Sequence, residues 1–217
     1  GLATNIWDGI PNMGKEQSGR RELTTEELEK VCSTATGSMR YWFAIGLYTG
    51  LRLGDVVTLK WNEVNLAEGI IERVPMKTRR TNKKVRFPIH SVLSLMLQEL
   101  TSRSGYLFPD EAEIYRNDDA AISKLVQKHL TDCGIQTTEA AVGHRRNRIV
   151  KVGFHSLRHS FVSLCAANRV PQVAIMELVG HGSPAMTALY SHAGDAQKAD
   201  AIAALPEVSF DNGKGNV

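Results

Sequence analysis

The sequence predicts a mainly α-helical protein that carries a small three-stranded antiparallel β-sheet. Most of the chain places apolar residues at the spacing of amphipathic helices. Two short β-type runs, 69–75 and 84–88, flank a basic turn, and residues 65–66 can add a third strand. Hydrophobic residues make up 42% and charged residues 23% of the 217 positions, which is typical of a globular protein with one substantial core.

The helices follow from local signals in chain order. Thr24 can cap the first helix, and Glu27, three residues later, completes a capping box. Between Met39 and Gly50 apolar and small residues occupy nearly every position, so this second helix is predicted to be buried on all sides. Further helices are predicted at residues 92–100, 118–133 and 195–205, while residues 139–154 are ambiguous between helix and strand.

Cysteine usage and hydropathy indicate the compartment. Cys32, Cys133 and Cys165 lie far apart, each at an apolar position of a predicted helix, and read as reduced core residues. No apolar run reaches the length of a membrane span, and no charged-then-apolar leader opens the chain. We therefore expect a cytoplasmic protein without a membrane partner.

Basic residues are concentrated in two places although the net charge is only +3. Six of the ten residues from Lys77 to Arg86 are basic, and a second cluster lies at 144–148. Such clusters on a nearly neutral body suit the phosphate backbone of double-stranded DNA, although two solvated loops would look the same. The predicted DNA-binding residues are Arg79, Arg80, Lys83, Lys84, Arg145, Arg146 and Arg148.

The stretch from His155 to Tyr190 combines side chains that suit phosphate chemistry. Leu157, Phe161, Leu164 and Cys165 predict the buried face of a helix, so His155 and Arg158 share another face. A second helix is predicted from Pro171 to Gly180, which leaves His181 just beyond it, and Ser183-Pro184 predicts a third short helix that carries Tyr190. Guanidinium forks match phosphate oxygens, and imidazoles move protons near neutral pH.

Arg52 stands beside the end of a predicted buried helix, where an arginine is unexpected. Buried charges persist when they are paired or when they bind a ligand. Asp55, three positions later, could orient Arg52 towards a ligand. An internal ion pair between the two residues without any ligand is the alternative.

Five separated segments, in this order, resemble the tyrosine recombinase, or phage integrase, family and specifically its catalytic domain. The segments are Thr49–Asp55, Lys77-Thr78, His155–Phe161, Leu178–His181 and Tyr190–His192. The resemblance covers residues 23–192 and implies the DNA breaking-rejoining fold of that family. It also implies a site-specific recombinase that cleaves DNA through a covalent 3′-phosphotyrosine, with no metal, ATP or other cofactor.

The resemblance assigns a role to each catalytic candidate. Residues matching Arg52 and Arg158 clamp the scissile phosphate, and the residue matching Lys77 protonates the leaving 5′ oxygen. Those matching His155 and His181 assist proton movement, and the residue matching Tyr190 attacks phosphorus. Asp55 matches a carboxylate position whose role as a support for Arg52 stays open.

The family pattern also implies a domain organisation. Residues 1–22 would be the remnant of an interdomain linker to an absent N-terminal DNA-binding domain, residues 23–205 the catalytic domain, and residues 206–217 a flexible C-terminal tail. The full-length protein would assemble as a tetramer on DNA and this fragment would be a monomer. The helix at 195–205 resembles one that relatives dock onto a neighbouring subunit, and in a lone domain it could fold back or stay loose.

Other functions remain open at this point. A type IB topoisomerase-like enzyme would use the same chemistry to relax supercoils. A DNA-binding module without catalysis is disfavoured because every expected catalytic position is occupied. A metal-dependent phosphohydrolase is weaker still, since no carboxylates accompany the histidines at ligand spacing.

Overall fold

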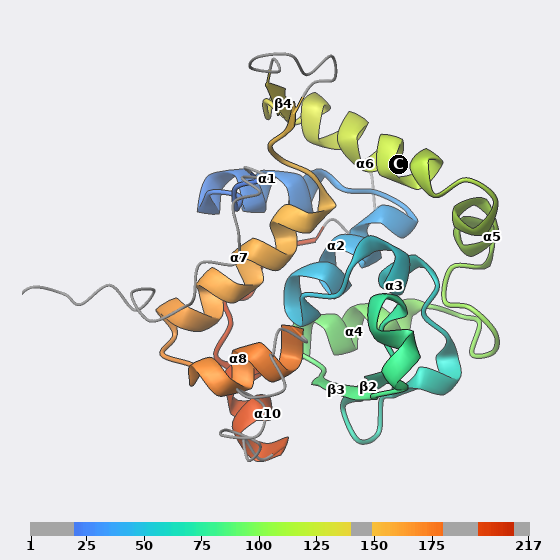
Figure 1. The fold of residues 1–217 in the computed structure, drawn as a ribbon, viewed down its shortest axis with the longest axis vertical. Coiled ribbons are helices and arrows are strands. Elements are labelled where there is room, and N and C mark those ends of the chain that lie inside the picture. The colour runs from blue at the N-terminus through green and yellow to red at the C-terminus, as the bar shows by residue number, and fades with distance from the viewer. Residues whose placement is uncertain (1–19, 140–148, 180–194, 211–217) are drawn as a thin grey trace, which may run out of the picture.

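A computed structural model describes residues 20–139, 149–179 and 195–210 of the chain (Figure 1). The second basic cluster with Arg145, Arg146 and Arg148 lies outside these ranges. The same holds for His181, for Tyr190 and for the short helix predicted to carry it.

The described part of the chain is mainly helical, as predicted. Its helices are α1 (Thr25–Thr34), α2 (Ser38–Thr49), α3 (Leu53–Val57), α4 (Ser91–Glu99), α5 (Pro109–Asn117), α6 (Asp119–Asp132), α7 (Phe154–Ala167), α8 (Gln172–Val179) and α10 (Asp195–Ala203). Two 3₁₀ helices, η1 (Trp61–Glu63) and η2 (Met76–Thr81), flank the first strands.

The predicted three-stranded antiparallel sheet is confirmed. Strand β2 (Ile70–Arg73) lies between β1 (Val64–Asn65) and β3 (Val85–Pro88). Ile71 pairs with Phe87, and both side chains are buried, so one face of the sheet covers the core. A second, two-stranded sheet joins β4 (Thr138–Glu139) to β5 (Ile149–Val150), within the stretch that the sequence left ambiguous.

Helix α2 is the centre of the core. Every residue from Arg40 to Thr49 is buried, in agreement with the sequence pattern. Gly46 allows close packing against α7, because a Cβ at this position would come within 2.7 Å of the Phe154 ring. Gly50 ends α2 with φ +64°, a left-handed conformation that glycine adopts without strain. The chain then turns directly into α3.

Two helices were not expected from the sequence. Helix α3 has only five residues, too few to show a helical period. In helix α5 only Ala112 is buried and the apolar Ile114 is exposed, so the helix lacks a buried apolar stripe. In α6, Leu125 follows the helical spacing of the apolar residues Ile122 and Val126 but is 46% exposed, so the apolar pattern alone would place it wrongly in the core.

The C-terminal helix α10 folds back onto its own chain, beside α8 and β3 (Figure 1). Lys198 forms an ion pair with Glu177 of α8 at 2.7 Å. Ala201, Ile202 and Leu205 are buried in the core. Of the two arrangements left open for this helix, the structure has the folded-back one.

Residues 206–210, where a flexible tail was expected to begin, also contact the body of the protein. The Tyr48 hydroxyl donates to the Pro206 carbonyl at 3.2 Å and accepts from the Val208 N–H at 3.1 Å. Val208 is buried. Two apolar side chains explain this packing: Val208 belongs to the core, and Phe210 packs against the core beside the Tyr48 ring.

Among the described residues, no helix has both the length and the apolar character needed to cross a membrane. The three cysteines are free and buried, as predicted.

Candidate active site

Arg158 lies in the second turn of α7 and is 5% exposed. Its guanidinium donates to the Gly50 carbonyl at 2.7 Å and to the carbonyl of Val179, the last residue of α8. These bonds hold the side chain between the ends of α2 and α8. A guanidinium has five N–H groups, so the two carbonyls leave donors that an anion can use.

The positive charge of Arg52 acts on Arg158. Burial, and after it the positive charge of Arg52, lower the pKa of Arg158 to about 10, while the charge of Asp55 acts in the opposite direction. The two guanidiniums are therefore close enough to repel each other. Arg52 is partly exposed at the N-terminus of α3. Two neighbouring cations of this kind favour the binding of an anion between them.

His155 lies one turn before Arg158 on the same helix. Burial lowers the pKa of its imidazole to about 4, and the neighbouring His159, Arg158, Arg20 and Arg52 contribute. The rings of His155 and His159 meet edge to face, with their centroids 5.0 Å apart. His155 is thus neutral at pH 7 and can both donate and accept a hydrogen bond.

We expect nuclear magnetic resonance titration to show His155 neutral down to about pH 4. Because its pKa in the folded protein lies below the unfolded value of about 6.5, the unfolded chain binds more protons in between. The free energy of unfolding should therefore fall as pH decreases from about 6.5 towards 4. Arg20→Gln removes one nearby cation and should raise the pKa of His155, whereas Arg169→Gln at the exposed end of α7 should leave it unchanged. Equal titration in both variants would contradict this account.

Asp55 does not pair with Arg52 as the sequence suggested. Its Oδ1 accepts from Nε of Arg73 at 3.4 Å and from the backbone N–H of Met76 at 2.8 Å. Arg73 lies at the end of β2 and is itself buried. It can therefore pair with the carboxylate of Asp55, which is only 1% exposed. Asp55 thus supports the start of η2, one residue before Lys77.

The basic turn forms η2 and the residues that follow it. Lys77, Arg79, Arg80, Lys83 and Lys84 are all exposed. Lys84 forms an ion pair with Glu72 of β2 at 2.6 Å, so part of its charge is neutralised within the sheet. The bond from the Met76 N–H to Asp55 places the start of η2 beside α3.

Two arginines near these residues were not recognised from the sequence. Arg20 lies in the predicted linker, yet its charge acts on both His155 and His159. Arg73 lies in a predicted strand, where nothing in the local pattern marks it as buried. The only signal that Arg73 is buried comes from its acidic partners, Asp55 and Glu63, which lie in other elements earlier in the chain.

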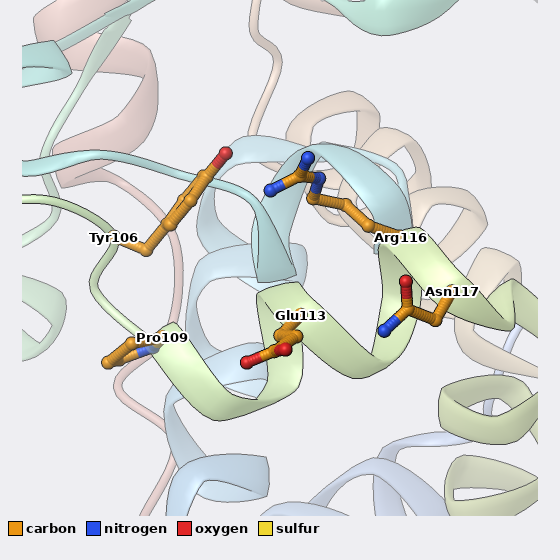
Figure 2. A pocket seen from close by; sticks show the side chains of 5 residues that line it. All are labelled: Tyr106, Pro109, Glu113, Arg116 and Asn117. Carbon is orange, nitrogen blue, oxygen red and sulfur yellow. The ribbon is translucent and has the colours of Figure 1, made fainter.

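A hollow of about 320 Å³ lies elsewhere, along α5 (Figure 2). Tyr106 stands on one side of it and Arg116 and Asn117 on the other. None of the predicted site residues lines it. Within the described ranges, no three His, Cys, Asp or Glu side chains gather as metal ligands would.

Residues 21–197 match the sequence profile of the Phage integrase family. The match covers most of the chain. The chain belongs to this family. Its relatives include a tyrosine recombinase XerC-like protein of Caldanaerobacter subterraneus subsp. tengcongensis, which is 24% identical over 86% of this chain and 54% of that protein. The chain spans about half the length of the curated relatives it matches.

Solved structures of phage integrases share the fold. The integrase from mycobacterium phage Brujita has a TM-score of 0.66 at 18% identity and covers 94% of this chain and 64% of its own. A lambda integrase tetramer bound to a Holliday junction has a TM-score of 0.53 at 16% identity, over 84% of this chain and 52% of its own. The predicted family and its catalytic-domain fold are thereby confirmed.

Proposed function

We propose that this chain is the catalytic part of a site-specific DNA recombinase that breaks and rejoins DNA through a covalent 3′-phosphotyrosine. One observation carries the proposal: Arg158 and the neutral His155 lie one turn apart on α7, and the positive charge of Arg52 acts on both. A phosphodiester is the anion in DNA that such a pair of arginines fits. The family to which the chain belongs supports the same assignment.

In the proposed reaction Arg52 and Arg158 hold the non-bridging oxygens of the scissile phosphate. The Tyr190 oxygen attacks phosphorus and loses its proton, the bond from phosphorus to the 5′ oxygen breaks, and Lys77 gives a proton to that oxygen. Rejoining reverses these steps. Because the phosphodiester energy is kept in the tyrosine linkage, the cycle needs no ATP.

The cations account for catalysis without a metal. Charge increases on the phosphate oxygens in the transition state, and fixed guanidiniums stabilise it there. A phenol with a pKa of about 10 needs a nearby base to attack at pH 7. His155, neutral at that pH, can accept a proton or hydrogen-bond the phosphate, and His181 would assist it.

DNA would lie across the surface formed by η2 and the basic residues after it. Arg79, Arg80 and Lys83 would contact the backbone, together with Arg145, Arg146 and Arg148. Because the lambda integrase with this fold is a tetramer on a Holliday junction, we infer a tetramer on DNA for the full-length protein and a monomer for this piece of it. A piece of this kind would bind DNA weakly and act in the cytoplasm.

The test is covalent capture on nicked suicide duplexes of randomised sequence, in which the cleaved strand loses a short fragment and cannot be rejoined. We expect an adduct that survives detergent and forms in EDTA without ATP, with the DNA 3′-phosphate attached to a tyrosine by mass spectrometry. An adduct that required a divalent metal, or free cleaved DNA without any adduct, would contradict the proposal.

A further inference from the structure

Arg73 is a charged residue in the protein interior, 6% exposed at the end of β2. Its Nε donates to Asp55 Oδ1 at 3.4 Å, and one terminal nitrogen donates to Glu63 Oε2 at 2.7 Å and to the Thr58 carbonyl at 3.1 Å. The other terminal nitrogen donates to the Thr58 hydroxyl at 2.7 Å. A buried arginine without partners is strongly destabilising, so the position of Arg73 requires this set of partners.

The same partners hold the start of η2. The Asp55 oxygen that accepts from Arg73 also accepts from the Met76 N–H at 2.8 Å. The Thr58 hydroxyl contacts the Met76 sulfur at 3.9 Å. Arg73 therefore holds the Asp55 carboxylate and, together with the Gly54 carbonyl to which the Thr58 hydroxyl donates at 2.5 Å, the Thr58 side chain. Both side chains touch Met76, the residue immediately before Lys77.

This support matters because Lys77 is exposed and lies beyond the end of the strand pairing. The last pair between β2 and β3 joins Arg73 to Val85. Beyond this pair, the bond from the Met76 N–H to Asp55 holds the start of η2 against α3. Helix α3 itself begins directly after Arg52. A proton donor must lie within hydrogen-bond reach of its target, and a displacement of about 1 Å can slow a reaction about 100-fold.

We propose that Arg73 is a positioning residue for proton donation by Lys77, acting through Asp55 and Thr58 to set where η2 begins relative to Arg52. The inference rests on the proposed function, because it needs Lys77 to protonate the leaving 5′ oxygen. Arg73 itself does not touch DNA in this account. It controls the geometry of the donor from inside the protein.

The chemistry of the leaving group separates this role from general stability. In normal cleavage the bond from phosphorus to O5′ breaks, and O5′ takes a proton from the Lys77 ammonium. If sulfur replaces that bridging oxygen, the sulfur departs as a thiolate. A thiol has a pKa of about 8.5, so the thiolate leaves without needing a proton. A fault in proton donation is therefore corrected by the sulfur substrate, whereas a fault elsewhere is not.

The experiment compares single-turnover cleavage of two suicide duplexes of one captured sequence, with oxygen or sulfur at the 5′ bridging position. We expect Arg73→Lys to cleave the oxygen substrate about 10- to 100-fold more slowly than wild type and the sulfur substrate within about threefold. Thr58→Val, which removes the hydroxyl bonded to Arg73, should show a smaller loss with the same selectivity. Lys77→Met is the reference for a lost proton donor and should be rescued by sulfur.

Arg40→Lys is the matched control, since Arg40 is also a buried arginine, 7% exposed, and pairs with Glu99 at another part of the core. It should lower the melting temperature without changing the ratio of the two rates. If Arg73→Lys does not fold, the rates of Thr58→Val on the oxygen and sulfur substrates provide the test. The role of Arg73 would be overturned if folded Arg73→Lys and Thr58→Val cleaved the oxygen and sulfur substrates equally slowly while sulfur restored cleavage by Lys77→Met. Failure of sulfur to rescue Lys77→Met would instead overturn the proposed role of Lys77.

Discussion

Replacing Arg158 with lysine is expected to reduce cleavage of a suicide duplex by at least about 1,000-fold, while DNA binding changes only a few-fold. Removal of one positioned donor from a transition state costs about 100- to 1,000-fold, and the loss of a phosphate-binding arginine can cost more. Lysine keeps the charge but offers a single ammonium in place of a planar fork. The measurements are single-turnover cleavage and equilibrium binding to the same duplex.

The bonds of Arg158 explain why charge alone is insufficient. Its guanidinium donates to the carbonyls of Gly50 and Val179 through two of its five N–H groups. The single ammonium of a lysine at this position cannot bind both carbonyls and the phosphate at the same time. Since binding depends on many backbone contacts, it should survive the change that stops the chemistry.

Arg169→Lys is the matched control, because Arg169 is an exposed arginine just beyond the same helix. It should cleave at the wild-type rate. If Arg158→Lys lost DNA binding in proportion to cleavage, Arg158 would be a docking residue rather than part of the reaction centre. In Arg158→Lys the carbonyls of Gly50 and Val179 lose their guanidinium donor, which can destabilise the fold. A melting curve for each variant therefore separates both outcomes from unfolding.

Local signals in the sequence predicted most of the fold. The capping box of Thr24 and Glu27 is present, with the Thr24 hydroxyl accepting from the Glu27 N–H. The buried helix α2 and the small sheet were also predicted, because their apolar patterns have a clear period. Helix α5 was missed although Pro109 in its first turn and two acidic residues after it are start signals.

The candidate site was predictable only in part, for a physical reason. Arg158 and His155 share a helix face, so their spacing alone brings them together. Arg52 joins them through the packing of α2 against α7, which no local pattern encodes. The predicted partner of Asp55 was wrong for the same reason: the nearest arginine in sequence is Arg52, but Arg73 at the end of β2 reaches the carboxylate on α3.

Replacing Tyr190 with phenylalanine is expected to abolish the covalent adduct while leaving DNA binding and the melting temperature unchanged. The variant lacks only the oxygen that would attack phosphorus, so no 3′-phosphate can be transferred to the protein. The measurement is detergent-stable capture of the suicide duplex that wild type captures.

Three of the four described tyrosines, Tyr41, Tyr48 and Tyr115, are poor alternatives as nucleophiles. Tyr41 and Tyr48 are buried in the core, and burial raises the pKa of Tyr48 to about 12. Burial also raises the pKa of Tyr115, whose hydroxyl lies against Gly54. Tyr106→Phe, at the hollow beside α5, is therefore the control and should form the adduct normally. An adduct that persisted in Tyr190→Phe would assign the attack to another residue, and peptide mapping of that adduct would identify it.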